Sequence, residues 1–273
     1  MTHSIFLLIF FGYFVSFVLY FMNFESQRET HYAWAQRAAL FSIFFQLVFI
    51  LATFVKTRFL PVTHLSEYYI EIVSFIILFV SLVIESRYKA RYLMLFSLPI
   101  VLIFCLFTIV LAEQKDASVI TRTSGWLWFH IGLILAGISS LIIAVSSALM
   151  YLLQSTQLKS KHLGRIFLKL PALGTLDRIH FRSLVWGILL FSLGMLMGLL
   201  WAKNIHELKH VLKDPTVVLS FLTCFMYWII LSFRFSAIRR GQKIAIGTVL
   251  ALTLLFLILL SSNVTPTGFH RGL

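Results

Sequence analysis

Long apolar segments recur along the entire chain and limit what it can fold into more than any other feature. A helix that crosses a lipid bilayer needs about 20 mostly apolar residues, and segments of this kind occur throughout the 273 residues. We predict eight spans, at residues 4–22, 37–55, 68–84, 92–111, 128–153, 182–202, 215–233 and 243–261. The sequence therefore predicts an all-α fold, a polytopic integral membrane protein built as a bundle of about eight transmembrane helices.

The composition excludes several classes of protein. Hydrophobic residues make up 60% of the chain and charged residues 12%, whereas soluble domains average about 45–50% and about 25%. An ordinary soluble enzyme, a disordered chain and a nucleic-acid-binding domain are therefore excluded. The connections between the spans are too short to hold a water-soluble domain, so residues 1–273 are predicted to form a single integral membrane domain.

The positive charges are distributed unevenly between the connections. Lys and Arg residues are about twice as numerous in the odd-numbered connections as in the even-numbered connections and the termini together. Because positively charged connections stay in the cytoplasm, the odd-numbered connections are predicted to be cytoplasmic. Both termini are then extracytoplasmic, and a bacterial inner membrane is the expected location.

Several short motifs follow one another along the chain in a definite order. Residues 59–67 (FLPVTHLSE) lead into the third span, and residues 128–132 (WFHIG) open the fifth. Later motifs are LPALGTLDR at 170–178, GMLMG at 194–198, DP at 214–215 and RRG at 239–241. In order and spacing these stretches resemble the cytochrome c assembly family, the group of CcsA, ResC and CcmC with their HemX-like and YpjD-like relatives. Eight spans with both termini outside agree with the HemX-like branch.

The resemblance implies a haem-binding site on the outer face of the membrane, where two external histidines flank a Trp-rich loop. His130 matches the first of these histidines and His270 resembles the second. Trp126, Trp128 and Trp201 are the aromatic side chains expected to pack against the haem. The resemblance thus implies haem as the cofactor, and an assembly or haem-handling factor rather than an enzyme.

Both histidines also have simpler interpretations. Beside Trp126 and Trp128, His130 is equally placed to anchor the fifth span at the level of the lipid headgroups. His270 lies in a terminal tail, where a histidine is usually solvated. The ligand interpretation therefore rests mainly on the resemblance.

The chain departs from the family pattern in two respects. The connection 202–214 corresponds to the Trp-rich loop but has lost its tryptophans. Gln46 and Ser232 occupy the positions of two further histidines within the spans, and neither is a normal haem ligand. We expect Gln46 to form a hydrogen bond between helices and Ser232 to bond within its own helix. These departures favour the HemX-like and YpjD-like branch over a haem-delivering synthase.

Other conspicuous residues have structural explanations. Residues 214–215 (DP) are expected to cap the seventh span, and the glycines of 194–198 to permit close helix packing. Glu67 and Glu71 are expected at the outer start of the third span, where the helix macrodipole favours acidic side chains. His180 is expected in a cytoplasmic connection.

The leading hypothesis is a protein that binds or passes haem at the outer face during cytochrome c biogenesis. Its expected partners are the lipid bilayer, haem and a second cytochrome c assembly membrane protein. A membrane regulator or scaffold linked to tetrapyrrole synthesis is an alternative, in which the basic connection 154–182 docks a cytoplasmic enzyme. A small ion or metal transporter is a third, against which the spans hold almost no buried charge.

Overall fold

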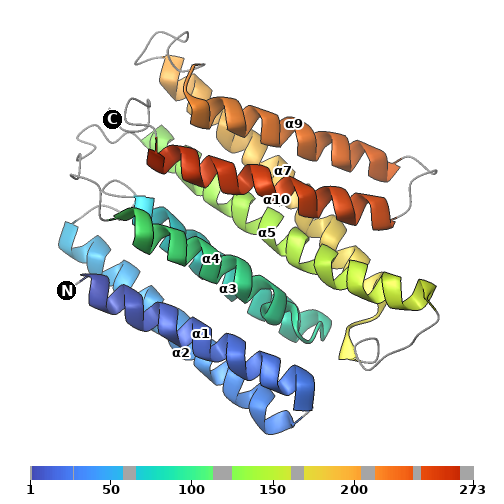
Figure 1. Ribbon diagram of the computed structural model, residues 1–273. Helices are drawn as coiled ribbons and strands as arrows, with labels where there is room; N and C mark the ends of the chain where they lie inside the picture. Colours follow the sequence, from blue (N-terminus) through green and yellow to red (C-terminus); the bar gives the residue numbers. More distant parts are fainter. Residues whose placement is uncertain are drawn as a thin grey trace. The chain divides into compact units, whose positions relative to one another are not determined.

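The protein is helical wherever the computed structural model describes it (Figure 1). The described residues are 2–26, 28–57, 66–112, 125–160, 169–203, 213–235 and 241–264. Their helices are α1 (Thr2–Ser26), α2 (Glu29–Thr57), α3 (Ser66–Tyr88), α4 (Leu93–Ala112), α5 (Gly125–Lys159), α7 (Leu173–Lys203), α9 (Pro215–Phe235) and α10 (Gly241–Val264). These described ranges contain no β-strand. The predicted all-α fold is confirmed.

Each predicted span coincides with one of these helices, but several helices are longer than predicted, most of all α2, α5 and α7. α2 begins at Glu29, well before residue 37. α5 continues to Lys159, and α7 begins at Leu173, well before residue 182. With 35 residues, α5 is about 52 Å long, whereas the hydrocarbon core of a bilayer is about 30 Å thick. Hydropathy marks only the part of a helix that lies in lipid. The polar segment 154–159 contains neither glycine nor proline, so the helix continues through it.

Six of the helices are long and apolar enough, by length and composition, to cross a membrane: α1, α2, α5, α7, α9 and α10. The described apolar part of α4, Leu93–Leu106, is shorter. α3 differs because it carries Glu71, Glu85 and Arg87 in its described part. The chain is therefore a multi-pass membrane protein.

The chain forms two compact units. Unit 1 comprises Met1–Gln114 with Leu153–Leu176, and unit 2 comprises Lys115–Leu152 with Asp177–Leu273. The candidate haem ligand His130 belongs to unit 2, whereas Gln46 and Glu71 belong to unit 1. That residues 1–273 act as a single domain stays a prediction.

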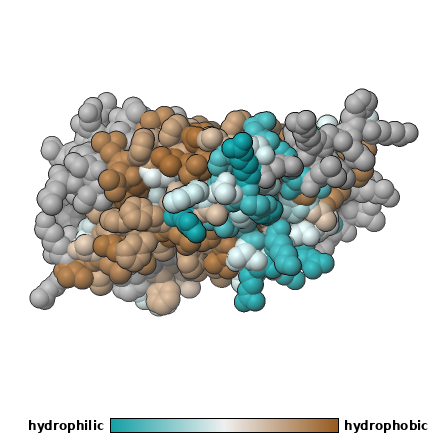
Figure 2. Space-filling model, turned by 90° about the horizontal axis from the view of Figure 1, so that it is seen from below, coloured by the Kyte–Doolittle hydropathy of each residue, from teal (hydrophilic) through white to brown (hydrophobic). Residues whose placement is uncertain are grey.

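In unit 1 the four N-terminal helices form a bundle. α1 packs on α2 and α3 packs on α4, while α1 also contacts α4 and α2 contacts α3. Large apolar side chains such as Phe11, Phe41 and Phe44 are exposed on the outside of the bundle. Figure 2 shows one face of the molecule, on which a broad hydrophobic area in brown adjoins a hydrophilic area in teal. An exterior of this kind is suited to lipid, with its polar part outside the hydrocarbon core.

In unit 2 the helices α5 and α7 approach each other closely at glycine residues, and α9 packs on α10. A Cβ atom added to Gly137 of α5 would lie 2.7 Å from the backbone nitrogen of Phe191 in α7. A Cβ added to Gly194 of α7 would lie 3.0 Å from the backbone nitrogen of Ile134 in α5. The packing role predicted for the glycines of 194–198 is thus confirmed at Gly194.

We predict that Gly137→Ala lowers the stability of the protein. The added methyl group would meet the backbone of α7, so we expect a loss of about 1–3 kcal/mol in the free energy of unfolding. Gly132→Ala is the matched control on the same helix, because a Cβ atom at Gly132 meets nothing within 4 Å. Thermal unfolding of the purified variants in detergent measures the difference, and equal midpoints for the two variants would contradict the close approach.

Candidate functional site

His130 lies near the start of α5, and its imidazole ring is held against α7. Its Nδ1 atom is 2.7 Å from the backbone carbonyl oxygen of Gly194. A carbonyl oxygen only accepts hydrogen bonds, so Nδ1 carries the proton and donates it. The side chain is half-buried. The ring therefore has a fixed position at one end of unit 2.

Gly198 provides the space that this position requires. A Cβ atom added to Gly198 would lie 2.6 Å from Nδ1 of His130 and 3.2 Å from its Nε2 atom. Any larger residue at 198 would displace the ring or the helix. The glycines of 194–198 were expected to serve helix packing alone. The structure adds that Gly194 supplies the carbonyl and Gly198 the room for the imidazole.

The hydrogen bond also determines which ring nitrogen can bind a metal ion. In a neutral imidazole with the proton on Nδ1, the lone pair is on Nε2. Histidines that bind metals commonly donate their other N–H to a backbone carbonyl or a carboxylate, which fixes both the tautomer and the ring orientation. His130 has this arrangement. The structure thus shows a histidine prepared for ligation through Nε2.

Two of the predicted tryptophans lie at the same end of unit 2 as His130. Trp126 is one turn before His130 on α5, and its side chain is 60% exposed. Trp201 is one turn after Gly198 on α7 and is buried. Trp128 is part of α5, but its side chain is outside the described residues. Aromatic side chains are therefore present on both helices that position the imidazole.

His270, the predicted second ligand, lies outside the described residues. So does most of the connection 202–214 that corresponds to the Trp-rich loop. The pairing of His130 with His270 stays a prediction. Among the described residues, no group of three or more His, Cys, Asp or Glu side chains is arranged to hold a bare metal ion.

The residues at the two family histidine positions have the structural roles expected from the sequence. The Gln46 side chain accepts a hydrogen bond from the Tyr13 hydroxyl and donates to Ser74 Oγ at 2.9 Å, which links α2 to α1 and α3. Ser232 donates to the carbonyl oxygen of Ile229 in its own helix at 2.8 Å. Neither side chain is arranged as a metal ligand.

The start of α9 is capped as predicted. The Asp214 carboxylate accepts a hydrogen bond from the backbone nitrogen of Thr216 at 2.8 Å. The backbone carbonyl of Asp214 accepts from the nitrogen of Val218 at 3.0 Å. Pro215 is the first residue of the helix. This arrangement explains the Asp–Pro pair without a catalytic role.

Glu71 lies deeper than the sequence indicates. Its backbone carbonyl accepts a hydrogen bond of 3.0 Å from the side-chain nitrogen of Gln46, so the two residues are at the same level. Gln46 precedes the end of α2 at Thr57 by about 16 Å along the helix axis. The Glu71 side chain is only 3% exposed. A carboxyl group expected at the outer rim of the third span is instead buried inside unit 1.

His180 was expected in a connection, but it is a buried residue of α7. Its Nε2 atom is 3.0 Å from Thr248 Oγ1 in α10, and that hydroxyl donates to the carbonyl of Ile244. His180 therefore donates to Thr248, which holds α7 against α10. One turn earlier, Asp177 forms an ion pair with Arg234 of α9, with one N–O distance of 2.9 Å. Both contacts join helices within unit 2.

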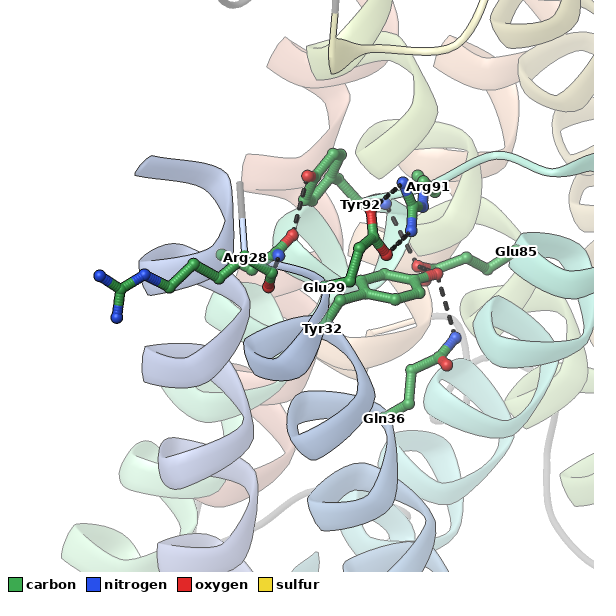
Figure 3. Close-up of polar contacts among 8 residues, drawn as sticks. Arg28, Glu29, Tyr32, Gln36, Glu85, Arg91 and Tyr92 are labelled. Atoms are coloured by element: carbon green, nitrogen blue, oxygen red, sulfur yellow. Dashed lines mark hydrogen bonds and ion pairs between the residues drawn. The ribbon is translucent and has the colours of Figure 1, made fainter. Parts of the chain in front are cut away.

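A second polar cluster, which was not predicted from the sequence, lies at the end of unit 1 where α3 is joined to α4 (Figure 3). The buried Glu85 carboxylate accepts from the Tyr32 hydroxyl at 2.7 Å. It also accepts from the backbone nitrogens of Tyr92 and Met94 at 3.2 and 3.3 Å. These amides lie just before α4 and in its first turn, so Glu85 caps α4 from the neighbouring helix. Gln36 in turn donates to the Tyr32 hydroxyl at 3.0 Å.

The same cluster joins the two helix pairs of unit 1. Arg91 forms a bidentate ion pair with Glu29 at the start of α2, and its guanidinium lies 4.5 Å from the centre of the Tyr32 ring. The Tyr92 hydroxyl donates to Asn23 of α1 at 2.8 Å. Tyr92 has a φ of 73°, so the chain makes a sharp turn there before entering α4. Side chains of α1 and α2 thereby fix the turn between α3 and α4.

Burial changes the acidity of Glu85, which lies one residue beyond the predicted third span. Removal from water raises the pKa of its carboxyl group to about 7. The hydroxyl of Tyr32 and the amides of Met94 and Tyr92 favour the charged form, and Arg91 adds a smaller contribution in the same direction. Glu85 therefore changes its charge close to neutral pH.

Comparison with known proteins places the chain among proteins of cytochrome c assembly. The family model described as "Cytochrome C assembly protein" matches residues 62–270. This range begins just before α3, so α1 and α2 precede the matched region. It includes His130, Gly194 and Gly198.

Several curated proteins are similar over more than half of the chain. The inner membrane protein YpjD of Escherichia coli strain K12 is 31% identical over 176 residues, which are 63% of this chain and 64% of YpjD. The protein HemX of Brevibacillus brevis is 27% identical over 70% of each chain. The cytochrome c biogenesis protein CcsA of Prochlorococcus marinus is 24% identical over 70% of this chain and 69% of its own length. The chain thus spans just under two thirds of the length of YpjD.

We predict that Glu85→Gln changes how stability depends on pH. A carboxyl group whose pKa rises from 4.5 to about 7 on folding stabilises the folded state only while protonated. This shift corresponds to a contribution of about 3 kcal/mol to the free energy of unfolding. The whole contribution is present below about pH 4.5, and it is lost as the pH rises through about 7. The free energy of unfolding of the natural protein should therefore fall relative to that of Glu85→Gln between about pH 5 and about pH 8.

Denaturant unfolding in detergent at several pH values measures this difference. Glu25→Gln is the control, because Glu25 is exposed on α1 and should leave the pH dependence unchanged. A stability difference between the natural protein and Glu85→Gln that does not vary with pH would contradict the assignment.

Proposed function

We propose that this chain, which belongs to the cytochrome c assembly protein family, binds haem and that His130 would hold the haem iron. The observation that carries the proposal is the hydrogen bond from Nδ1 of His130 to the Gly194 carbonyl. It leaves the lone pair of the neutral ring on Nε2, the nitrogen that would face the iron. We propose haem as the ligand because of the family relationship, and His130 as the residue that binds it because of the hydrogen bond to Gly194.

The residues around His130 fit a haem group. The imidazole is half-buried and is fixed by a backbone carbonyl, so little conformational freedom is lost when it binds iron. The exposed side chain of Trp126 offers aromatic surface at the same end of unit 2, where Trp201 is buried. Haem supplies the iron and its redox chemistry when bound, whereas the chain supplies ligation, orientation and an apolar surround. His270 is the second ligand that we propose.

The departures from the family pattern limit the proposed activity. Gln46 and Ser232 have structural hydrogen bonds, so the family's histidine sites within the spans are not reproduced at these positions. We therefore assign the chain to the HemX-like and YpjD-like branch, as a haem-handling factor in cytochrome c biogenesis that is not an enzyme by itself. A second assembly protein in the same membrane is the proposed partner.

We further propose that the chain resides in a bacterial inner membrane with both termini on the extracytoplasmic side. The relative YpjD is named an inner membrane protein, which supports the location. The distribution of Lys and Arg supports the orientation. In this orientation the start of α5, with His130, lies at the outer face.

We predict that the purified protein binds haemin and that His130→Ala removes the binding. Titration with haemin should produce a Soret band and resolved α and β bands for the natural protein after reduction. His130→Ala should lose them, and added imidazole should restore part of the absorbance by entering the vacated position. A natural protein that remains colourless after titration would contradict the proposal.

Gly198→Ala tests the geometry more finely. The added methyl group would displace the His130 ring from the Gly194 carbonyl, so we expect haemin affinity to fall by about 10–100-fold, as for other supporting contacts of metal ligands. Gly132→Ala is the control, since a Cβ at Gly132 meets nothing within 4 Å. Equal affinities for the two variants would show that Gly198 does not position the ligand.

The orientation is tested with reporter fusions. Alkaline phosphatase, which is active only outside the cytoplasm, should be inactive when fused after Lys161 and active when fused after Lys209. Fluorescence of a cytoplasmic reporter should show the reverse. The same result at both positions would contradict the predicted topology.

A further inference from the structure

The inner face of α3 in unit 1 is mostly polar. The positions 71, 74, 78, 81 and 85 follow the alternating spacing of three and four residues that keeps side chains on one face of a helix. All five side chains are buried, and four of them are polar: Glu71, Ser74, Ser81 and Glu85. Polar groups are costly inside a membrane bundle, and they commonly serve a function there. A carboxyl group lies at each end of this row.

A matching row lies on α1. Tyr13, Ser16, Tyr20 and Asn23 follow the same spacing, and all four are buried. α1 contacts α2 and α4, and these two helices contact α3, so α1 and α3 lie across the bundle from each other. The two polar rows therefore face the same interior, which we call the polar axis of unit 1.

Hydrogen bonds are present at the Glu71 end of the polar axis. The Tyr13 hydroxyl donates to the side-chain oxygen of Gln46, and the Gln46 nitrogen donates to Ser74 Oγ at 2.9 Å. Ser74 Oγ donates to the carbonyl of Glu71 at 2.8 Å. Helices α1, α2 and α3 are thereby joined by polar contacts at the level of Glu71.

Further polar contacts lead toward Glu85. Ser81 and Ser97 hydroxyls are 3.1 Å apart, which links α3 to α4 along the axis. At the far end, Glu85 accepts from the Tyr32 hydroxyl. Glu71 and Glu85 are separated by about 21 Å along α3, a large part of the roughly 30 Å hydrocarbon core.

Tyr20 supplies an independent observation. Its side chain is completely buried, and its hydroxyl makes no hydrogen bond with any described residue. Its ring packs edge-on against Tyr32, with 5.8 Å between the ring centres, which places it next to the partner of Glu85. A buried hydroxyl without a partner costs about 1–3 kcal/mol, and protein interiors usually satisfy such a group with an internal water molecule.

We propose that the polar axis of unit 1 is a proton path that connects Glu85 at the end of the bundle with Glu71 in its interior. A proton leaves the Glu85 carboxyl group, which becomes a carboxylate. It passes by exchange of O–H bonds along hydroxyl groups and internal water, and a proton is bound by the Glu71 carboxylate. Solvent at the end of the bundle protonates Glu85 again. This function is separate from haem binding by unit 2.

The acid–base properties of the two ends support this path. The pKa of Glu85 is raised to about 7 by burial, so it accepts and releases a proton near neutral pH. The titratable or charged groups near Glu85 are Tyr20, Tyr32, Tyr92 and Arg91. Those near Glu71 are Tyr13 and Cys105. The Glu71 side chain is buried, so it places a carboxyl group at the inner end of the axis.

Infrared spectroscopy of the full chain in lipid vesicles tests the proposal. At neutral pH the natural protein should show a carbonyl band of a protonated carboxylic acid that Glu71→Gln removes. The control Glu25→Gln, at an exposed position, should retain this band. If Glu71→Gln does not fold, Glu71→Asp assigns the band by shifting its frequency. Absence of a protonated Glu71 band would overturn the proposal.

Deuterium exchange tests the path itself. After transfer to heavy water, the Glu71 band should shift rapidly in the natural protein. Tyr20→Phe should slow the shift by about tenfold or more, since removal of one hydroxyl interrupts the exchange along the axis. Tyr20→Phe removes a hydroxyl that has no described partner, so the fold should be retained. Equal exchange rates in both proteins, or no exchange in the natural protein, would overturn the proposal and indicate a structural role for these residues.

Discussion

The close approach of α5 and α7 is the constraint on which the candidate haem site depends. Helix backbones are normally covered by their own side chains, so an imidazole from a neighbouring helix seldom reaches a carbonyl oxygen. Glycine at 194 and 198 removes this cover, and the His130 ring then reaches the Gly194 carbonyl at 2.7 Å. One contact thereby fixes the position, the orientation and the tautomer of the proposed ligand.

The polar groups in the interior of unit 1 need hydrogen-bond partners within the protein. When a protein folds in water, a hydroxyl or amide group exchanges its hydrogen bonds to water for hydrogen bonds within the protein at little net cost. Lipid offers no hydrogen-bond partner in place of the protein. Gln46 meets this need by bonding to Tyr13 and Ser74, and Glu85 by capping the start of α4. The sequence had argued against a transport function because the spans hold almost no buried charge. The buried carboxyl group of Glu71 removes that objection for unit 1.

The features predicted correctly from the sequence are those that depend on local pattern. Apolar length predicts the positions of the helices, Asp214 and Pro215 predict a cap, and an isolated amide such as Gln46 predicts a bond between helices. The extensions of α2, α5 and α7 beyond the predicted spans were not predicted, because these polar segments carry no hydropathy signal. The depth of Glu71, the burial of His180 and the cluster at Glu85 depend on the register between helices, which no local pattern encodes. To predict that Gly198 leaves room for the His130 ring would also have required the register between α5 and α7.

Nitrogen-15 NMR of histidine-labelled protein in lipid nanodiscs tests the central claim most directly, with the His130 signals assigned by their loss in His130→Ala. At neutral pH and without haem, the account predicts a proton on Nδ1 of His130 and a non-protonated Nε2 signal that shifts when haemin is added. A proton on Nε2 in the haem-free protein, or an Nε2 signal unaffected by haemin, would contradict it.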